Sequence, residues 1–98
     1  MTFEEAYDKY SDEEYGHFDR VKNKLSTRKD LHAFILLDKL VPSKNEGWDI
    51  VSVAEHDEFW LGIEVSDLND AATEEQMIEL IRCGVRYDSG ADALAFFT

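Results

Sequence analysis

The sequence predicts a small α+β domain in which two to three helices pack on a roughly four-stranded, mainly antiparallel sheet. Apolar residues recur at helical spacing in some segments and alternate every second residue in others. Short polar turns between neighbouring strand candidates indicate hairpins, and therefore antiparallel pairing. The predicted order of elements is α-α-β-β-α-β-β, and all 98 residues are expected in one domain.

The first part of the chain is predicted to be helical. Residues 11–26 begin with Ser11 and Glu14 at capping-box spacing, followed by apolar residues three and four positions apart. These apolar residues are Phe18, Val21 and Leu25. Residues 2–10 have apolar side chains on one side and are interpreted as a short helix of their own.

A second long helix is predicted within residues 26–43. Either Ser26 or Thr27 is its expected N-cap, and Pro42 ends it because proline cannot continue the backbone hydrogen bonds. Its apolar face is broad, which is typical of a central core helix. His32 is expected on the surface of this helix.

Two strands are predicted next, at residues 48–55 and 59–65, with the polar residues 56–58 as the turn. The second strand alternates, so its core side consists of Phe59, Leu61, Ile63 and Val65. Trp60 falls on the opposite side. It is either an aromatic residue for contact with a partner or part of a second core layer beneath a helix.

The remaining elements are a helix and a hairpin. Residues 66–73 are interpreted as a polar connection with one helical turn or none, and residues 74–83 as a helix that Gly84 ends. Residues 85–87 and 93–97 are predicted as the two strands of a closing hairpin.

The chain is strongly acidic, with a net charge of −12. Residues 1–20 carry −5, residues 21–45 carry +4 and residues 46–98 carry −11. Nucleic acid and anionic membranes are therefore disfavoured as partners, because both attract basic surfaces. Such a charge either steers the protein towards basic surfaces or serves solubility alone.

No motif in the sequence requires catalysis. The stretch EHDE at residues 55–58 offers metal-type ligands, but it lacks the paired His or Cys spacing of a zinc site, and a solvated turn explains it more simply. Cys83 follows a predicted helix end rather than a helix start, so we expect a buried structural thiol. We therefore expect no catalytic, metal-binding or cofactor-binding residues.

The candidate function is binding of a protein partner through an acidic surface. The candidate residues are Glu55, Asp57, Glu58, Trp60, Glu64, Asp67, Asp70, Glu74 and Glu75. We expect the partner to have a basic surface of the kind that holds nucleic acid, and we expect the acidic protein to be a monomer or a homodimer.

In size and charge the chain is similar to DNA-mimic inhibitors of phages and mobile elements, including the anti-CRISPR type, and to immunity proteins that block nuclease toxins. No motif supports this likeness, and it assigns no family. The polar N-terminal stretch and the lack of long apolar runs predict a cytoplasmic protein, located in the host cytoplasm if a phage encodes it.

Two alternatives remain open at this point. One is a small metal-dependent enzyme that uses His56 and the neighbouring acids. The other is a structural or regulatory protein that works as a homodimer.

Overall fold

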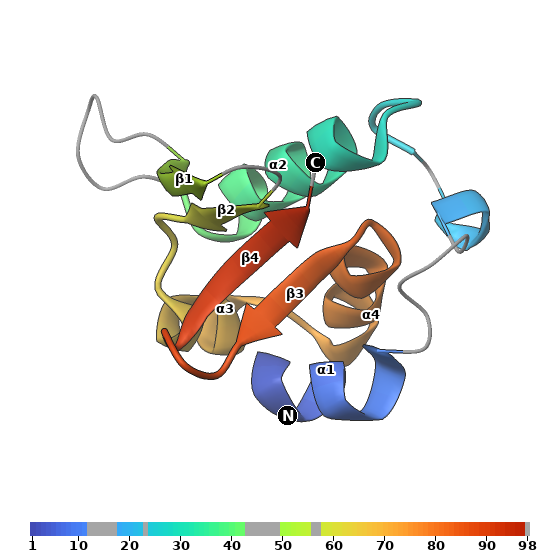
Figure 1. Cartoon of the computed structure of the whole chain (residues 1–98). Helices are drawn as coiled ribbons and strands as arrows, with labels where there is room; N and C mark the ends of the chain where they lie inside the picture. Colours follow the sequence, from blue (N-terminus) through green and yellow to red (C-terminus); the bar gives the residue numbers. More distant parts are fainter. Residues whose placement is uncertain (12–17, 23, 43–49, 56–57, 98) are drawn as a thin grey trace.

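The computed structural model describes residues 1–11, 18–22, 24–42, 50–55 and 58–97 (Figure 1). Its elements, in chain order, are α1 (Phe3–Tyr10), the 3₁₀ turn η2 (Phe18–Arg20), α2 (Lys29–Leu40), β1 (Val51–Glu55), β2 (Glu58–Leu61), α3 (Val65–Ala71), α4 (Glu74–Arg82), β3 (Val85–Asp88) and β4 (Ala93–Phe97). The predicted α+β class is confirmed.

The four strands form one antiparallel sheet in the order β1-β2-β4-β3. Figure 1 views this sheet with α2, α3 and α4 behind it, while α1 lies along its lower edge and packs on α4, α3 and β3. The C-terminal hairpin therefore does not stand apart: β4 inserts between β2 and β3 and joins the two predicted hairpins into one sheet.

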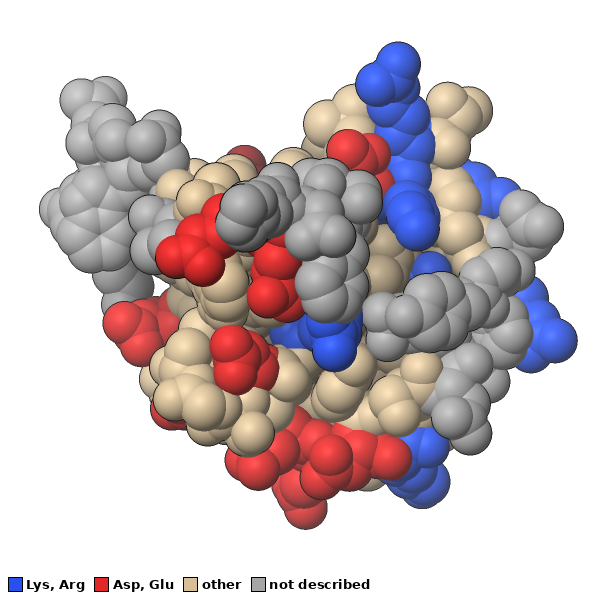
Figure 2. All heavy atoms as spheres, viewed as in Figure 1, with Lys and Arg blue, Asp and Glu red and all other residues tan. Residues whose placement is uncertain are grey.

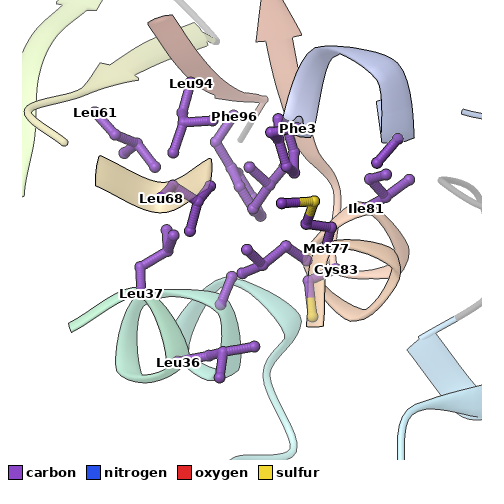
Figure 3. Close-up of a cluster of buried hydrophobic side chains, with 14 of the residues drawn as sticks. Phe3, Leu36, Leu37, Leu61, Leu68, Met77, Ile81, Cys83, Leu94 and Phe96 are labelled. Carbon is purple, nitrogen blue, oxygen red and sulfur yellow. The ribbon is translucent and has the colours of Figure 1, made fainter. Parts of the chain in front are cut away.

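The core lies between the sheet and the helices behind it (Figure 3). Phe59 and Phe96 are neighbours in the sheet register, and Phe34 of α2 packs against both rings with centroid distances of 5.9 Å. The fully buried side chains around this contact include Phe3, Leu37, Leu68, Met77, Leu80, Ile81 and Leu94. The sides of the strands and helices that face the core are thus apolar, as the alternation of residues in the strands predicts.

The short helix expected near the start of the chain is α1. The Thr2 side chain accepts a hydrogen bond from the Glu5 backbone N–H, and the Glu5 carboxylate accepts one from the Thr2 backbone N–H. This capping box satisfies two backbone donors that a helix start leaves unpaired. The backbone N–H of Phe3 donates to Oδ1 of Asn69 at 2.7 Å, so α1 is also tied to α3.

The helix predicted over residues 11–26 is wrong from residue 18 onwards. Residues 12–17 lie outside the described residues. Only Phe18–Arg20 forms a helical turn there. Val21 is buried, but Leu25 is 41% exposed, so the predicted apolar stripe does not face one core. The Leu25 N–H donates to the His32 ring rather than to a carbonyl one turn earlier, which is incompatible with a continuing helix.

The second helix is confirmed as α2, with two corrections. Its N-cap is Arg28 rather than Ser26 or Thr27, and the Ser26 hydroxyl instead accepts a hydrogen bond from the Arg28 N–H. His32 is 1% exposed and not on the helix surface.

The boundaries around the first hairpin also differ from the prediction. Strand β2 ends at Leu61. The Gly62 N–H still pairs with the Ile50 carbonyl, and the chain then turns away from the sheet into α3. Val65, predicted as the end of this strand, begins α3, in which Val65 and Leu68 are buried on one side. The connection expected at residues 66–73 is therefore largely helical. Of the first predicted strand, residues 48–49 lie outside the described residues.

Gly84 ends α4 as predicted. Its φ of +98° lies in the region that glycine adopts without steric cost. The β3–β4 hairpin follows at once, and Asp92 in its turn has a φ of +48°. Aspartate tolerates this left-handed conformation better than most residues.

Replacing a buried leucine of α2 should destabilise the protein far more than replacing an exposed one on the same helix. Leu37 is 0% exposed and Leu31 is 46% exposed. We expect Leu37→Ala to lower the free energy of unfolding by about 2–5 kcal/mol through lost burial and a cavity, and Leu31→Ala to change it by about 0.5 kcal/mol or less. Urea denaturation measures both values, and equal effects would contradict the packing of α2 described above.

Candidate protein-binding surface

The face of the sheet that looks away from the core carries a mixed polar and aromatic surface. The register places Trp60 opposite Ala95, and Ala95 opposite Arg86, across three neighbouring strands. We call this surface the outer sheet face, made of Glu55, Glu58, Trp60, Arg86, Asp88 and Ala95. No helix that the structure describes covers it in Figure 1.

Trp60 and Asp88 are held together across this face. The indole N–H of Trp60 donates to Oδ2 of Asp88 at 2.8 Å, although β4 lies between their two strands. Oδ1 of the same carboxylate accepts hydrogen bonds from the backbone N–H groups of Gly90 and Ala91. The hydrogen bond from Trp60 lowers the pKa of Asp88 below its ordinary value, and the two backbone donors add to the effect. This side chain is therefore a fixed negative charge beside an aromatic ring.

Glu58 and Arg86 form the second polar pair of the outer sheet face. Their charged atoms are 3.6 Å apart, and both side chains are about one-quarter to one-third exposed, at 26% and 32%. Arg86 Nε also donates to the Tyr7 hydroxyl of α1 at 3.3 Å, which connects the sheet to that helix. An ion pair this exposed contributes little to stability. It leaves Glu58 accessible to a second cation.

A shallow recess of about 350 Å³ lies between these pairs. It is lined by Glu58, Arg86, Tyr87, Asp88, Ser89 and Ala95. Ala95 is 1% exposed, in line with its place between the larger residues Trp60 and Arg86. The floor is therefore small and neutral, while the rim is charged.

The negative field extends to the turn of the last hairpin. The Tyr87 hydroxyl donates to Oδ1 of Asp92 at 2.6 Å. This hydrogen bond, together with burial and the charges of Asp92, Glu4 and Asp88, raises the pKa of Tyr87 to about 12. Carboxylates of α1 and of the β3–β4 hairpin thus act on the same phenol.

The structure divides the predicted binding residues between the two sides of the molecule. Glu55, Glu58 and Trp60 belong to the outer sheet face, whereas Asp57 lies outside the described residues. Glu64 precedes α3 as its N-cap, and Asp67 and Asp70 are on α3. Glu74 and Glu75 occupy the first turn of α4. Of these last five, only Glu64 was predicted within a strand, and it leaves the sheet because β2 ends at Leu61 and the chain turns into α3.

The acids on α4 have a local role as well. The Tyr10 hydroxyl donates to Oε1 of Glu74 at 2.6 Å, which joins the end of α1 to the start of α4. Acidic residues in the first turn of a helix also interact favourably with the helix dipole. Figure 2 shows Asp and Glu gathered mainly on the left and lower parts of the molecule, with Lys and Arg mainly on the right and top.

Three residues of the outer sheet face were not among the candidate binding residues, namely Arg86, Asp88 and Ala95. The predicted strand 85–87 contains Arg86, but Asp88 lies beyond its predicted end, and β3 extends to Asp88. The hairpin pattern does not show that this strand lies close to Trp60, since that depends on which hairpin strand pairs with β2.

Catalytic and metal chemistry finds no support among the residues that the structure describes. They contain no group of three or more His, Cys, Asp or Glu side chains that could hold a metal ion. Cys83 is 0% exposed, and burial raises the pKa of its thiol to about 12, so it is protonated rather than nucleophilic at neutral pH. His56 and Asp57 of the EHDE stretch lie outside the described residues, and the metal hypothesis for that stretch stays untested.

Comparison of the chain with protein-family models, with curated proteins and with solved structures finds no match. Among the described residues, no helix has the length and apolar character needed to cross a membrane.

Removing the indole donor should raise the pKa of the Asp88 carboxyl towards its ordinary value. In Trp60→Phe the Gly90 and Ala91 N–H groups remain, so we expect a partial rise. A carboxyl whose pKa is lower in the folded state stabilises the fold above its unfolded pKa and loses this contribution as the pH falls. The wild type should therefore lose more stability than Trp60→Phe on acidification.

Carbon-13 NMR of the side-chain carboxyls measures this titration directly. Tyr87→Phe is the matched control, because it removes a hydroxyl bonded to Asp92 rather than to Asp88. An unchanged Asp88 titration in Trp60→Phe would show that the indole does not hold this carboxylate.

Proposed function

We propose that this protein is a small non-enzymatic inhibitor or modulator that docks on the basic, nucleic-acid-binding surface of a protein partner. The observation that carries the proposal is the outer sheet face, where the fixed Asp88 carboxylate, the exposed Glu55 and the partly exposed Glu58 share one face with Trp60. The net charge of −12 supports it on the scale of the whole molecule.

The arrangement suits recognition of lysine and arginine side chains. A carboxylate already held by three hydrogen bonds loses little conformational freedom on binding, which lowers the cost of association. The face of an indole ring attracts cations, and tryptophan is common among residues that dominate binding energy. Glu58 can exchange its exposed partner Arg86 for a cation of the other protein.

The surrounding charge would speed association. Long-range attraction between a strongly acidic protein and a basic groove raises the association rate and weakens with salt. The basic residues of this chain are concentrated in another part of the sequence, because residues 21–45 carry a net positive charge. The molecule would therefore approach its partner with its acidic side forward.

Small size and a strongly acidic charge are typical of inhibitors encoded by phages and mobile elements, including the DNA-mimic and anti-CRISPR types. A protein of this kind acts in the cytoplasm of the host cell and needs no cofactor. It occupies the surface that its target uses for nucleic acid.

Charge changes on the outer sheet face should abolish partner binding, while equal changes elsewhere should not. The test variant combines Glu55→Lys with Glu58→Gln, and the matched control combines Asp38→Lys with Asp30→Asn on α2, where both acids are exposed. Each pair changes the net charge equally, because both contain one acid-to-lysine and one acid-to-amide substitution.

The measurement is a tagged pull-down from host-type lysate at about 0.1 M and about 0.5 M salt, with bound proteins identified by mass spectrometry. We expect one nucleic-acid-binding partner that the wild type and the control retain at low salt and that the test variant loses. Equal retention by both variants would contradict the proposed surface, and capture that is insensitive to salt would contradict the electrostatic mechanism.

A further inference from the structure

His32 is the one polar or charged side chain that is buried among the described residues, at 1% exposure. Both of its ring nitrogens have partners. Nδ1 lies 3.0 Å from the backbone nitrogen of Leu25, and Nε2 lies 2.9 Å from Oε2 of Glu79 on α4. One ring thus joins α2, α4 and the segment that precedes α2.

The two contacts define the state of the ring. A backbone N–H can only donate, so Nδ1 must accept and carries no hydrogen. Nε2 then carries the hydrogen of the neutral ring and donates it to the Glu79 carboxylate. An imidazolium would place a second hydrogen on Nδ1, directed at the Leu25 amide hydrogen. The ring can therefore gain a proton only if the bond to Leu25 breaks.

The charged groups around the ring differ in their effect on this proton. Glu79 is 28% exposed, and its carboxylate lies next to Nε2, where it attracts a positive charge. On α4, the buried Cys83 thiol adds no charge at neutral pH. Lys29, on α2 itself, acts on the same Cys83 and disfavours a further positive charge nearby. On the preceding segment, Lys24 lies over the Phe18 ring, whose edge contacts His32.

The bond to Leu25 is one of several contacts that hold the segment preceding α2 against the fold. We call it the latch segment, made of Phe18–Lys22 and Lys24–Leu25. Val21 is 6% exposed and Phe18 packs against the core, whereas the Leu25 side chain is 41% exposed. The bond to His32 therefore holds the end of the segment whose side chain the core does not hold. A cleft of about 410 Å³ lies between it and α4, lined by Arg20, Val21, Lys22, Glu75, Ile78, Glu79 and Arg82.

We propose that His32 is a pH-sensitive latch, whose protonation breaks the Leu25 hydrogen bond and frees the Leu25 end of the latch segment. The imidazolium keeps its contact with Glu79, so the loss falls on the latch segment and not on the packing of α2 against α4. This inference is independent of the proposed partner binding.

Amide hydrogen exchange and ring nitrogen-15 NMR of the whole protein test the proposal between about pH 8 and about pH 5, the range in which histidine changes charge. We expect the protection factor of the Leu25 amide to fall roughly tenfold, as for the loss of one hydrogen bond, in step with the His32 ring titration. The Leu80 amide in α4 should keep its protection, which separates release of the segment from global unfolding.

Two variants make the test specific. His32→Asn places an acceptor near the position of Nδ1 but cannot be protonated, so Leu25 should stay protected at both ends of the range. Glu79→Gln removes the charge that favours the imidazolium, so the transition should move to lower pH. If His32→Asn does not fold, the wild type and Glu79→Gln still decide the matter.

Three results would overturn the proposal. Loss of Leu25 protection without titration of the His32 ring would show that the ring is not the trigger. Titration of the ring while Leu25 stays protected would show that the bond survives protonation. A ring that stays neutral down to about pH 5 would show that no switch operates in this range.

Discussion

The contact among Phe34, Phe59 and Phe96 determines how the rest of this structure is arranged. The Phe59 and Phe96 rings stack across β2 and β4 with centroids 5.5 Å apart, and Phe34 of α2 packs against both. Because neighbouring residues in a strand point to opposite faces, this contact sends Trp60 and Ala95 to the other side. The helices pack on the face of the sheet that carries the Phe59 and Phe96 rings, and the outer sheet face carries the polar groups.

A sheet face that no described helix covers must satisfy its own polar groups, and here it does so in a way that leaves negative charge available. The indole of Trp60 and two backbone N–H groups hold the Asp88 carboxylate, so this charge is fixed without a neutralising cation among these contacts. Glu58 and Arg86 form an ion pair with a distance of 3.6 Å between the charged atoms, and both side chains are partly exposed. The same geometry that completes the fold therefore presents carboxylates beside an aromatic ring, which is the basis of the proposed function.

Local pattern predicted the fold class, the helices α2 and α4, the short helix α1 and both hairpins, because each depends on spacing and capping within a few residues. It failed where a distant partner decides the backbone. Leu25 leaves the predicted helix because the His32 ring takes its N–H, and Val65 leaves the predicted strand to bury its side chain in α3. The contact between Trp60 and Asp88 also escaped prediction, since it depends on β4 inserting between β2 and β3.

The most direct test of the central claim is an NMR titration of nitrogen-15-labelled protein with a short arginine-rich peptide at low salt. The account predicts the largest shift changes at the Trp60 indole N–H and at the amides of β2 and β3, with loss of these changes when salt is added. Changes confined to α1 and α4, where Glu74 and Glu75 lie, would contradict it. Those acids would then form the cation-binding surface, and the outer sheet face would serve the fold alone.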